Sequence, residues 1–565
     1  MRLFVLSTFA LVASLAINLQ ACSSVAYRSS DYEARQQLLQ TNLDQIPADQ
    51  RPETTRQLER FQWRVGINHD LVWQIYNAED TPAGRDFLNA FLQDTAAPQY
   101  FKWISLQKLT QIERDAGRQS EAVRLWERNR SAFPDHQDEV DEIIAILEAK
   151  SEATKIKDPG AGINSSAAEY SPAPSQDGKL LYFTAFDRPG GKGGEDIWVS
   201  DLQKGSTTNL DAINTPSYEY ITSISADGNN ILLLGNYTDS LGGGDLYLAT
   251  RNSRGWQKPR HLSEPINSEH FDCDGVLTPD GKAILFTSDR PSPYYPYHKK
   301  NQDFGGDNWG NTDIYIAFID KDMQAKRIVH LGPIINTPGA ERTPWLHVDG
   351  RTLYFASNGF NGLGRMDIYK TERLDDSWQK WSRPVHTGKI LNGIGNDWGL
   401  KLTARANQAW VAGQLTAASQ ESDLYLIEPL PMAARPSRGI AVIKGKVLDS
   451  SGKALQADII WRTNQSAQSG QQQSNPADGT YYLSLPRGAK YNIHFQKQGY
   501  QARDLQIDLG KTTQFSEQTR LVTLQADPNQ KANDQSGGRR AGNHGFNKSR
   551  CKQTAIDNIL RRSPL

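Results

Sequence analysis

The sequence predicts a multidomain, mainly β protein: a five-bladed β-propeller with an N-terminal α-helical repeat domain and a C-terminal β-sandwich. Three observations predict this fold class. Residues 163–430 repeat one pattern five times, residues 31–150 carry helical periodicity, and residues 439–525 carry short alternating strands broken by Gly and Pro. A chain of 565 residues also exceeds what one hydrophobic core can hold, so several domains are expected.

Each of the five copies opens with an Asn behind an apolar residue and closes with Asp, an apolar residue and an aromatic residue. The openings are Ile163-Asn164, Ile213-Asn214, Ile266-Asn267, Ile335-Asn336 and Leu391-Asn392, and the closings begin at Asp196, Asp245, Asp313, Asp367 and Asp423. Repeats of this kind are typical of propeller blades, because one four-stranded blade must stack on its neighbours to bury both faces. We therefore assign residues 163–430 to a propeller.

Turn signals divide each copy into strands. Asp-Gly pairs beginning at Asp177, Asp227, Asp280 and Asp349 precede mostly apolar runs, and Asp-Gly suits a tight hairpin before a buried strand. The fifth copy has Ala406-Asn407 in place of Asp-Gly. Glycine-rich turns follow the apolar runs, and the recurring Asp is expected to accept backbone N–H groups there. The Thr278-Pro-Asp-Gly-Lys282 pattern with the Asp-Ile-Tyr closings resembles the WD-repeat-like blades of the TolB family.

The first 22 residues predict a lipoprotein signal peptide. Arg2 supplies a positive charge, residues 3–17 form an apolar core too short to span a bilayer, and Leu19-Gln-Ala-Cys22 ends in a cysteine that would carry the lipid. Ser23 follows, with nothing acidic to retain the protein in the inner membrane. We expect lipidation at Cys22 and an outer membrane location, facing the periplasm. Gln20 is unusual in such a box, which leaves ordinary secretion with an incidental Cys22 as the alternative.

Residues 31–150 predict an α-helical domain. Val140, Ile143, Ile144 and Leu147 fall on one helix face, and the turn Asp115–Arg118 separates two helices of a hairpin. Earlier helices are expected around Arg56–Val65, Asp70–Ala78 and Arg85–Leu92. The spacing of Gly117, Ala122, Trp126 and Pro134 resembles a single tetratricopeptide repeat. A polar linker over 151–162 is expected to separate this domain from the propeller.

Two segments follow the propeller. Residues 439–525 carry Gly445-x-Val, Asp478-Gly-x-Tyr and Gln498-Gly-Tyr500 motifs, which are similar to the carboxypeptidase regulatory-like domain, a non-catalytic adaptor. Residues 526–565 lose this patterning and carry mostly basic charge, so they predict a disordered basic tail.

The order of helical repeat, propeller and regulatory-like sandwich resembles the PorE-type outer-membrane lipoproteins associated with type IX secretion and gliding motility. In that family an OmpA-like, peptidoglycan-binding domain comes next, and its motifs are missing after Leu524. Peptidoglycan is therefore not an expected partner of this chain alone. A shifted reading frame or truncation, or a natural variant that relies on another subunit, would each explain the tail.

No motif indicates catalysis, a metal site or a cofactor. A nucleophile elbow and a zinc-protease motif are both absent from the sequence, and the glycines of 190–194 join two strands rather than open a helix. The ten histidines are interpreted as scattered singly. The formal net charge of −1 gives no reason to expect nucleic acid as a partner.

A long loop in the third copy is the candidate partner-binding site. It holds Tyr294, Tyr295, Tyr297, His298, Lys299, Lys300, Phe304 and Trp309. Exposed aromatic and basic residues favour a binding hot spot, although rings that fold back to cap the propeller would give the same composition. Asp303, Asp307 and Asn308 do not match a known calcium loop closely.

These observations predict a non-enzymatic outer-membrane lipoprotein that acts as a protein–protein interaction scaffold in the cell envelope. The resemblance implies envelope or secretion-system proteins as partners, with the membrane reached through the N-terminal lipid. The alternative is a lipid-anchored propeller enzyme or glycan-binding protein, which acids converging on a central channel would favour.

Overall fold

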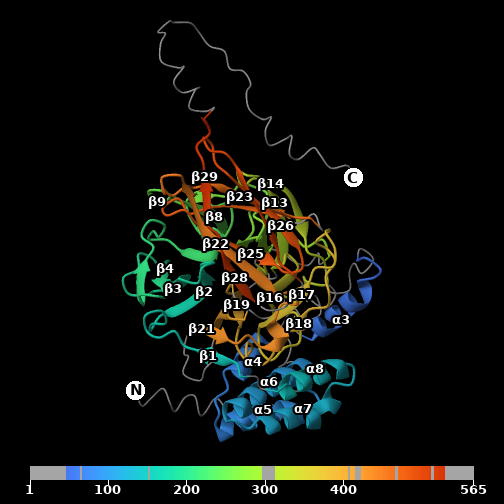
Figure 1. Cartoon of the computed structure of the whole chain (residues 1–565). Helices are drawn as coiled ribbons and strands as arrows, with labels where there is room; N and C mark the ends of the chain where they lie inside the picture. Colours follow the sequence, from blue (N-terminus) through green and yellow to red (C-terminus); the bar gives the residue numbers. More distant parts are fainter. Residues whose placement is uncertain are drawn as a thin grey trace.

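The computed structural model describes residues 46–63, 67–150, 153–294, 312–404, 407–413, 422–464, 469–510 and 515–528 (Figure 1). Six α-helices lie in the described residues before 150. They are α3 (Arg51–Gln62), α4 (His69–Tyr76), α5 (Pro82–Gln93), α6 (Gln99–Asp115), α7 (Gln119–Asn129) and α8 (Gln137–Glu148), with a short 3₁₀ turn, η2 (Arg130–Ala132).

Local signals explain where these helices begin and end. Asn68 caps α4, because its side-chain oxygen accepts the N–H groups of Asp70 at 3.1 Å and Leu71 at 3.4 Å. Gly117 has a φ of +71° directly after α6, and this left-handed residue turns the chain into α7. Helices α4 to α8 share one core that includes Trp103, Trp126 and Leu363, a residue from a turn of the β-rich part. The layer therefore packs on the strands rather than standing apart (Figure 1).

Residues 155–428 form five sheets. The first contains β2 (Ala168–Pro174), β3 (Leu180–Phe186), β4 (Glu195–Asp201) and β5 (Ser206–Asn209). The second contains β6 (Glu219–Ile224), β7 (Asn230–Gly235), β8 (Asp245–Asn252), β9 (Gly255–Trp256) and β10 (Arg260–His261). The third contains β11 (Asp272–Leu277), β12 (Ala283–Ser288), β13 (Asp313–Ile319) and β14 (Ala325–His330). The fourth contains β15 (Glu341–Leu346), β16 (Thr352–Ser357), β17 (Asp367–Glu372) and β18 (Val385–His386). The fifth contains β19 (Trp398–Leu402), β20 (Ala409–Gly413), β21 (Asp423–Glu428) and β1 (Lys155–Lys157).

The turn chemistry of the first four sheets agrees with the sequence. Gly178, Gly228, Gly281 and Gly350 have φ angles of +68°, +70°, +68° and +66°, which is the left-handed region that the Asp-Gly signal predicts. The apolar runs that follow form the buried strands β3, β7, β12 and β16. These two predictions are confirmed.

The expected linker over 151–162 contributes a strand. Lys155 to Lys157 pair antiparallel with Glu428 to Leu426, so β1 becomes the fourth strand of the fifth sheet. The fifth copy has no later strand of its own in this position, because the chain leaves for the C-terminal sheets after β21. The fourth strand of the fifth sheet therefore comes from a segment far away in the sequence. The local composition of residues 151–162 does not predict this pairing.

The first strands of the five sheets, β2, β6, β11, β15 and β19, form what we call the first-strand cluster. Each contacts the first strand of the next sheet, and β19 also contacts β2. All five have a register shift of the bulge type against their partner strand. Bulges re-aim side chains and increase the local twist, so the cluster can place polar groups between the sheets.

The recurring Asn joins each connecting loop to the sheet before it. The Oδ1 atoms of Asn214, Asn267, Asn336 and Asn392 accept the backbone N–H that follows the recurring Asp, at 2.7 to 2.9 Å. Asn164 makes the same bond to Leu424 N at 3.0 Å, across to the fifth sheet. The repeated Asn is therefore a structural link between consecutive sheets.

Two further sheets form the C-terminal part and share one apolar core. One contains β22 (Ile440–Asp449), β25 (Thr480–Pro486), β28 (Ser516–Thr519) and β29 (Val522–Leu524). The other contains β23 (Asp458–Thr463), β24 (Ser469–Gln473), β26 (Lys490–Gln496) and β27 (Arg503–Asp508). This pair docks on the Asp-Gly turns, where Gln471 N donates to Asp280 O at 3.2 Å and Gln473 N donates to Asp227 Oδ2 at 3.2 Å.

The predicted fold class is wrong. The described strands form seven separate sheets rather than a closed five-bladed β-propeller, since the pairing of named strands never passes from one sheet into another. The two C-terminal sheets share one apolar core, as the predicted β-sandwich requires. The helices in the described residues pack on the strands, with α4 to α8 in one core, so they form no separate N-terminal α-helical repeat domain. The physical reason is that repetition specifies strands inside each sheet, whereas sheets join through side chains and single backbone bonds that the repeat pattern does not encode.

Candidate functional site

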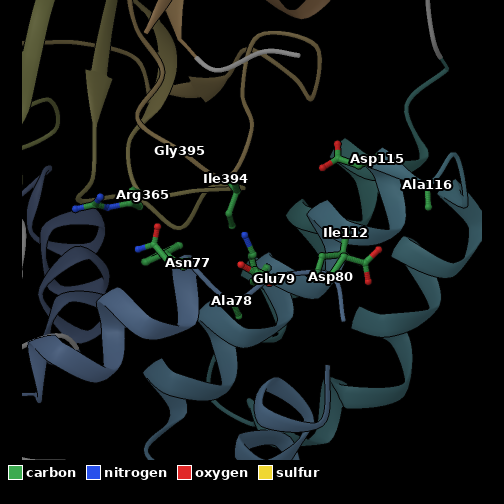
Figure 2. Close-up of a pocket in the computed structure, with 12 residues that line it drawn as sticks. Asn77, Ala78, Glu79, Asp80, Ile112, Asp115, Ala116, Arg365, Ile394 and Gly395 are labelled. Carbon is green, nitrogen blue, oxygen red and sulfur yellow. The ribbon is translucent and has the colours of Figure 1, made fainter. Parts of the chain in front are cut away.

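A groove lies between the helical layer and the loops of the fourth and fifth sheets. Its volume is about 640 Å³. The helical wall consists of Tyr76, Asn77, Ala78, Glu79, Asp80, Lys108, Ile112, Asp115 and Ala116, and the sheet wall consists of Arg365, Ile394 and Gly395. Figure 2 shows Arg365 and Ile394 on the sheet side, facing the loop that carries Asn77 and Glu79. A space of this size fits a small ligand or a few side chains of a partner.

Hydrogen bonds from α6 fix the floor of the groove against the sheets. Gln107 Nε2 donates to Gly362 O at 2.7 Å and to Gly364 O at 3.3 Å, while Tyr76 OH donates to Gln107 Oε1 at 3.1 Å. The Arg365 guanidinium lies 5.7 Å from the centre of the Tyr76 ring, within range of a cation–π contact. Both walls are therefore held in place by the protein itself.

The sheet wall depends on glycines in the Asn361–Gly364 turn. A Cβ on Gly362 would lie 2.1 Å from Asp367 Oδ2, and a Cβ on Gly364 would lie 2.3 Å from Gly393 O. Asp367 accepts the N–H groups of Leu363 at 3.2 Å and Gly364 at 3.1 Å. The prediction that the recurring Asp accepts backbone bonds in this turn is confirmed here, and the turn carries the loop that holds Arg365.

An ion-pair network stabilises the helical wall. Arg85 Nη1 and Arg118 Nε each lie 2.5 Å from the Glu113 carboxylate, and Arg85 Nε lies 2.6 Å from Asp80 Oδ1. The hydrogen bond from Arg118, together with Arg85, lowers the pKa of the buried Glu113 despite its desolvation. The network joins the end of α6 to the start of α5, which positions Asp80 at the groove.

Two ionisable groups in the groove have no protein hydrogen-bond partner among the described residues. They are the Lys108 ammonium and the Glu79 carboxylate. Burial lowers the pKa of Lys108, and the charge of Asp115 opposes this effect. Glu79 is exposed at the groove edge. The groove can therefore bind a negative group at Lys108 and a positive group at Glu79, beside the apolar surface of Ile112, Ala116 and Ile394.

The residues that the sequence singled out do not form this groove. Tyr294 is half-buried, with its ring centre 5.2 Å from that of His330, and burial raises the pKa of its hydroxyl. Tyr295, Tyr297, His298, Lys299, Lys300, Phe304 and Trp309 lie outside the described residues, as does Cys22. The partner-binding loop and the lipidation site thus stay predictions. The tail assigned to 526–565 is described only to 528, where Asp527 N still donates to Gly499 O at 2.9 Å.

Sequence reasoning missed a second repeated pattern that the structure explains. His261, His330 and His386 each stand six residues before the recurring Asn, and their Nε2 atoms lie 2.6, 2.9 and 3.1 Å from Asp245, Asp313 and Asp367. The interpretation of the histidines as scattered singly is wrong for these three. Their spacing from Asn was the available signal, and their role is to tie the fourth strand of a sheet to its third.

A buried acid five residues after each Asn is a further repeated position. The five acids are Glu169, Glu219, Asp272, Glu341 and Asp397, and burial raises the pKa of each, to about 8 for Glu341 and about 8 for Asp397. Each accepts bonds from the loop behind it; Glu341 accepts Thr337 N at 2.8 Å and Thr337 Oγ1 at 2.6 Å. They serve to close the connecting loops.

The described residues contain neither a candidate metal site nor a candidate membrane-spanning helix. No cluster of three or more His, Cys, Asp or Glu side chains there has the arrangement of a metal site. Among the helices in the described ranges, none is both long enough and apolar enough to cross a bilayer.

Comparison with known proteins adds little. No protein-family model and no curated protein matches the chain. A solved prolyl endopeptidase is 14% identical over 62% of this chain and 41% of its own length, with a TM-score of 0.26. Catechol 1,2-dioxygenase of Acinetobacter radioresistens is 10% identical over 16% of this chain and 53% of its own, with a TM-score of 0.13. The chain thus spans about half or less of these proteins, and similarities this weak carry no argument about fold or activity.

Proposed function

We propose that this chain is a non-enzymatic lipoprotein of the outer membrane that acts as a protein–protein interaction scaffold in the cell envelope, associated with type IX secretion or gliding. The signal sequence ending at Cys22 supports the anchor. The observation that carries the scaffold role is the groove between the helical layer and the loops of the fourth and fifth sheets, where Lys108 and Glu79 have no hydrogen-bond partner in the part of the chain that the structure describes.

The chemistry of the groove favours an extended segment of a partner protein. Glu79, Asp80 and Asp115 place three carboxylates on the helical wall, and Asp80 is already paired with Arg85. Glu79 and Asp115 are exposed, so a Lys or Arg of the partner can reach them. Lys108 suits a carboxylate or backbone carbonyl of the same segment, and Ile112 with Ile394 suits an apolar side chain.

Blocking the groove tests this proposal. Ala116 is exposed at the end of α6, and Ala116→Arg places a long charged side chain into the groove. We expect loss of at least ten-fold in the amount of partner crosslinked in cells to a photoreactive residue at position 77, because the segment loses its space and its charge complementarity. Crosslinked products are measured by immunoblot and mass spectrometry.

Ser120→Arg is the matched control, since Ser120 is an exposed position in the next helix and does not line the groove. It should crosslink like the wild type. The melting temperatures of both variants should lie close to the wild-type value, because neither position is buried. Unchanged crosslinking in Ala116→Arg would contradict the groove as the docking site.

The anchor is tested separately with Cys22→Ala. We expect this variant to leave the membrane pellet and appear in the soluble fraction, because lipidation requires the cysteine thiol. Fractionation of cells with high-salt washes measures the distribution. Retention of the variant in the outer membrane after those washes would contradict lipid anchoring while leaving the groove proposal untouched.

A further inference from the structure

Trp73 presents a large aromatic ring to solvent. Its side chain is 65% exposed, whereas the other tryptophans of the described residues are buried or half-buried. Leu71, Val72 and Ile75 of the same helix, α4, belong to the helical core, and Trp73 does not. Aromatic side chains contribute most when they are buried, so this ring is available for contact from outside the chain.

Trp73 adjoins the groove. Asn77 lines the groove and stands four residues after Trp73, so the two side chains are neighbours on the surface of α4. The backbone N–H and the Nδ2 of Asn77 both donate to Trp73 O, at 3.1 and 2.8 Å. Figure 2 shows Asn77 at the groove, below Arg365. The outer face of α4 therefore continues the surface of the groove.

A carboxylate accompanies the ring. Asp70 stands three residues before Trp73, which makes the two side chains neighbours on the helix. Asp70 is exposed, and no cation pairs with it in the part of the chain that the structure describes. It lies in the first turn of α4, where the helix N-terminus favours negative charge. Glu79 follows at the groove edge, so this outer surface has a carboxylate at each end and suits a positively charged group.

Tryptophans elsewhere in the chain show how such a ring is used. The guanidinium of Arg373 lies 4.4 Å from the centre of the Trp378 ring. That of Arg251 lies 5.7 Å from the centre of the Trp256 ring. Both distances are within range of a cation–π contact. Trp73 has no such contact with any described residue.

We propose that Trp73 and Asp70 bind an arginine side chain of the partner segment that enters the groove. The planar guanidinium stacks on the indole, while its N–H groups donate to the Asp70 carboxylate. Lysine fits less well, because its ammonium is a compact point charge that cannot stack. This inference rests on the proposed groove for its occupant, and it names the residue that the occupant carries just outside the groove.

The subsite is tested on the purified full chain with N-acetylarginine methylamide as the probe. Tryptophan is labelled with ¹⁵N, and the indole N–H signal that disappears in Trp73→Phe is assigned to Trp73. We expect the probe to shift this signal saturably, and the citrulline analogue, which has nearly the same shape but no charge, to leave it in place. Trp256 already carries Arg251, so its signal should not respond.

Asp70→Asn should weaken binding of the probe about three-fold, because the guanidinium loses its counter-charge. Asp138→Asn is the matched control, since it removes the same charge from an exposed site in the first turn of α8. It should bind the probe like the wild type. No shift of the Trp73 signal, an equal shift with the citrulline analogue, or equal affinity in Asp70→Asn and Asp138→Asn would overturn the subsite.

Crosslinking in cells tests whether the partner uses this subsite. With the photoreactive residue at position 77, Trp73→Leu should lower the crosslinked product about five-fold or more, and Trp73→Phe should lower it less, because phenylalanine keeps an aromatic face. Equal product from Trp73→Leu and the wild type would contradict use of the subsite by the partner.

The two experiments separate this inference from the groove proposal. If the arginine probe shifts the Trp73 signal but the wild type gives no crosslink at position 77, the groove proposal fails and the arginine subsite stands. If Ala116→Arg abolishes crosslinking but the probe does not bind, the groove proposal stands and the arginine subsite fails.

Discussion

Replacing Arg342 with methionine is expected to lower the free energy of unfolding by about 3–5 kcal/mol, the typical cost of breaking a buried ion pair. Both side chains are almost fully buried, at 7% and 2% exposure for Arg342 and Asp274. Methionine keeps much of the volume but leaves the Asp274 carboxylate without its counter-ion. Urea denaturation followed by tryptophan fluorescence measures the change.

The double variant Asp274→Asn with Arg342→Met separates charge from packing. Asn tolerates the left-handed backbone at position 274, so the double variant should recover most of the loss. Arg128→Met is the surface control, because Arg128 pairs with Glu121 at 2.8 Å near the surface. We expect this substitution to lower the free energy of unfolding by less than about 1 kcal/mol. An Arg342→Met variant as stable as this control would show that the buried pair does not hold the sheets together.

Replacing Glu341 with glutamine is expected to change how stability depends on pH. Burial, with the charge of Asp313, raises the pKa of Glu341 to about 8 in the folded chain. The pKa of an unfolded glutamate is about 4.3. At pH values between this pKa and the folded pKa, the folded state keeps the proton and the unfolded state loses it, so the free energy of unfolding falls as the pH rises. The wild type should lose roughly 1.4 kcal/mol per pH unit relative to Glu341→Gln across this window, and the difference should level off above it.

Glutamine has the shape of the protonated acid and carries no charge. The hydroxyls of Thr337 and Ser357 donate to the Glu341 carboxylate at 2.6 and 2.7 Å, and each can rotate to accept a hydrogen bond from the glutamine NH₂ group. Denaturation midpoints from pH 5 to pH 8.5 measure the effect. Glu148→Gln, at an exposed site at the end of α8, is the control and should run parallel to the wild type. A Glu341→Gln curve that also runs parallel would mean that the carboxyl is ionised in the folded protein throughout.

The sequence predicted local features well where short-range chemistry decides them. The Asp-Gly pairs turned out to hold glycines of positive φ, the apolar runs became buried strands, and the recurring Asp367 accepts N–H groups in a glycine-rich turn. Each of these depends on residues within about ten positions of one another. Local backbone preference and the alternation of apolar residues are enough to specify them.

The candidate groove could not be predicted in the same way. Gln107 and Gly362, which hold its two walls together, lie far apart in the chain, and nothing in the sequence pairs the helix of Gln107 with the glycine-rich turn of Gly362. The unpartnered Lys108 reads as an ordinary surface lysine in a helix until the sheet loops are placed against α6. The repeated His and acidic positions were visible in the sequence, but their role was not, because a spacing does not say which atom a side chain reaches.

By itself, the sequence determined the turns, the strands they separate, the helices before residue 150 and the recurrence of an Asn at the start of every copy. Only the tertiary structure decided that β1 completes the fifth sheet, that the described strands form seven separate sheets, and that Arg342 pairs with Asp274 in the interior. The reason is physical: turns and strands follow from short-range sterics and hydrogen bonds, whereas the balance of buried charge depends on which distant side chains exclude water together.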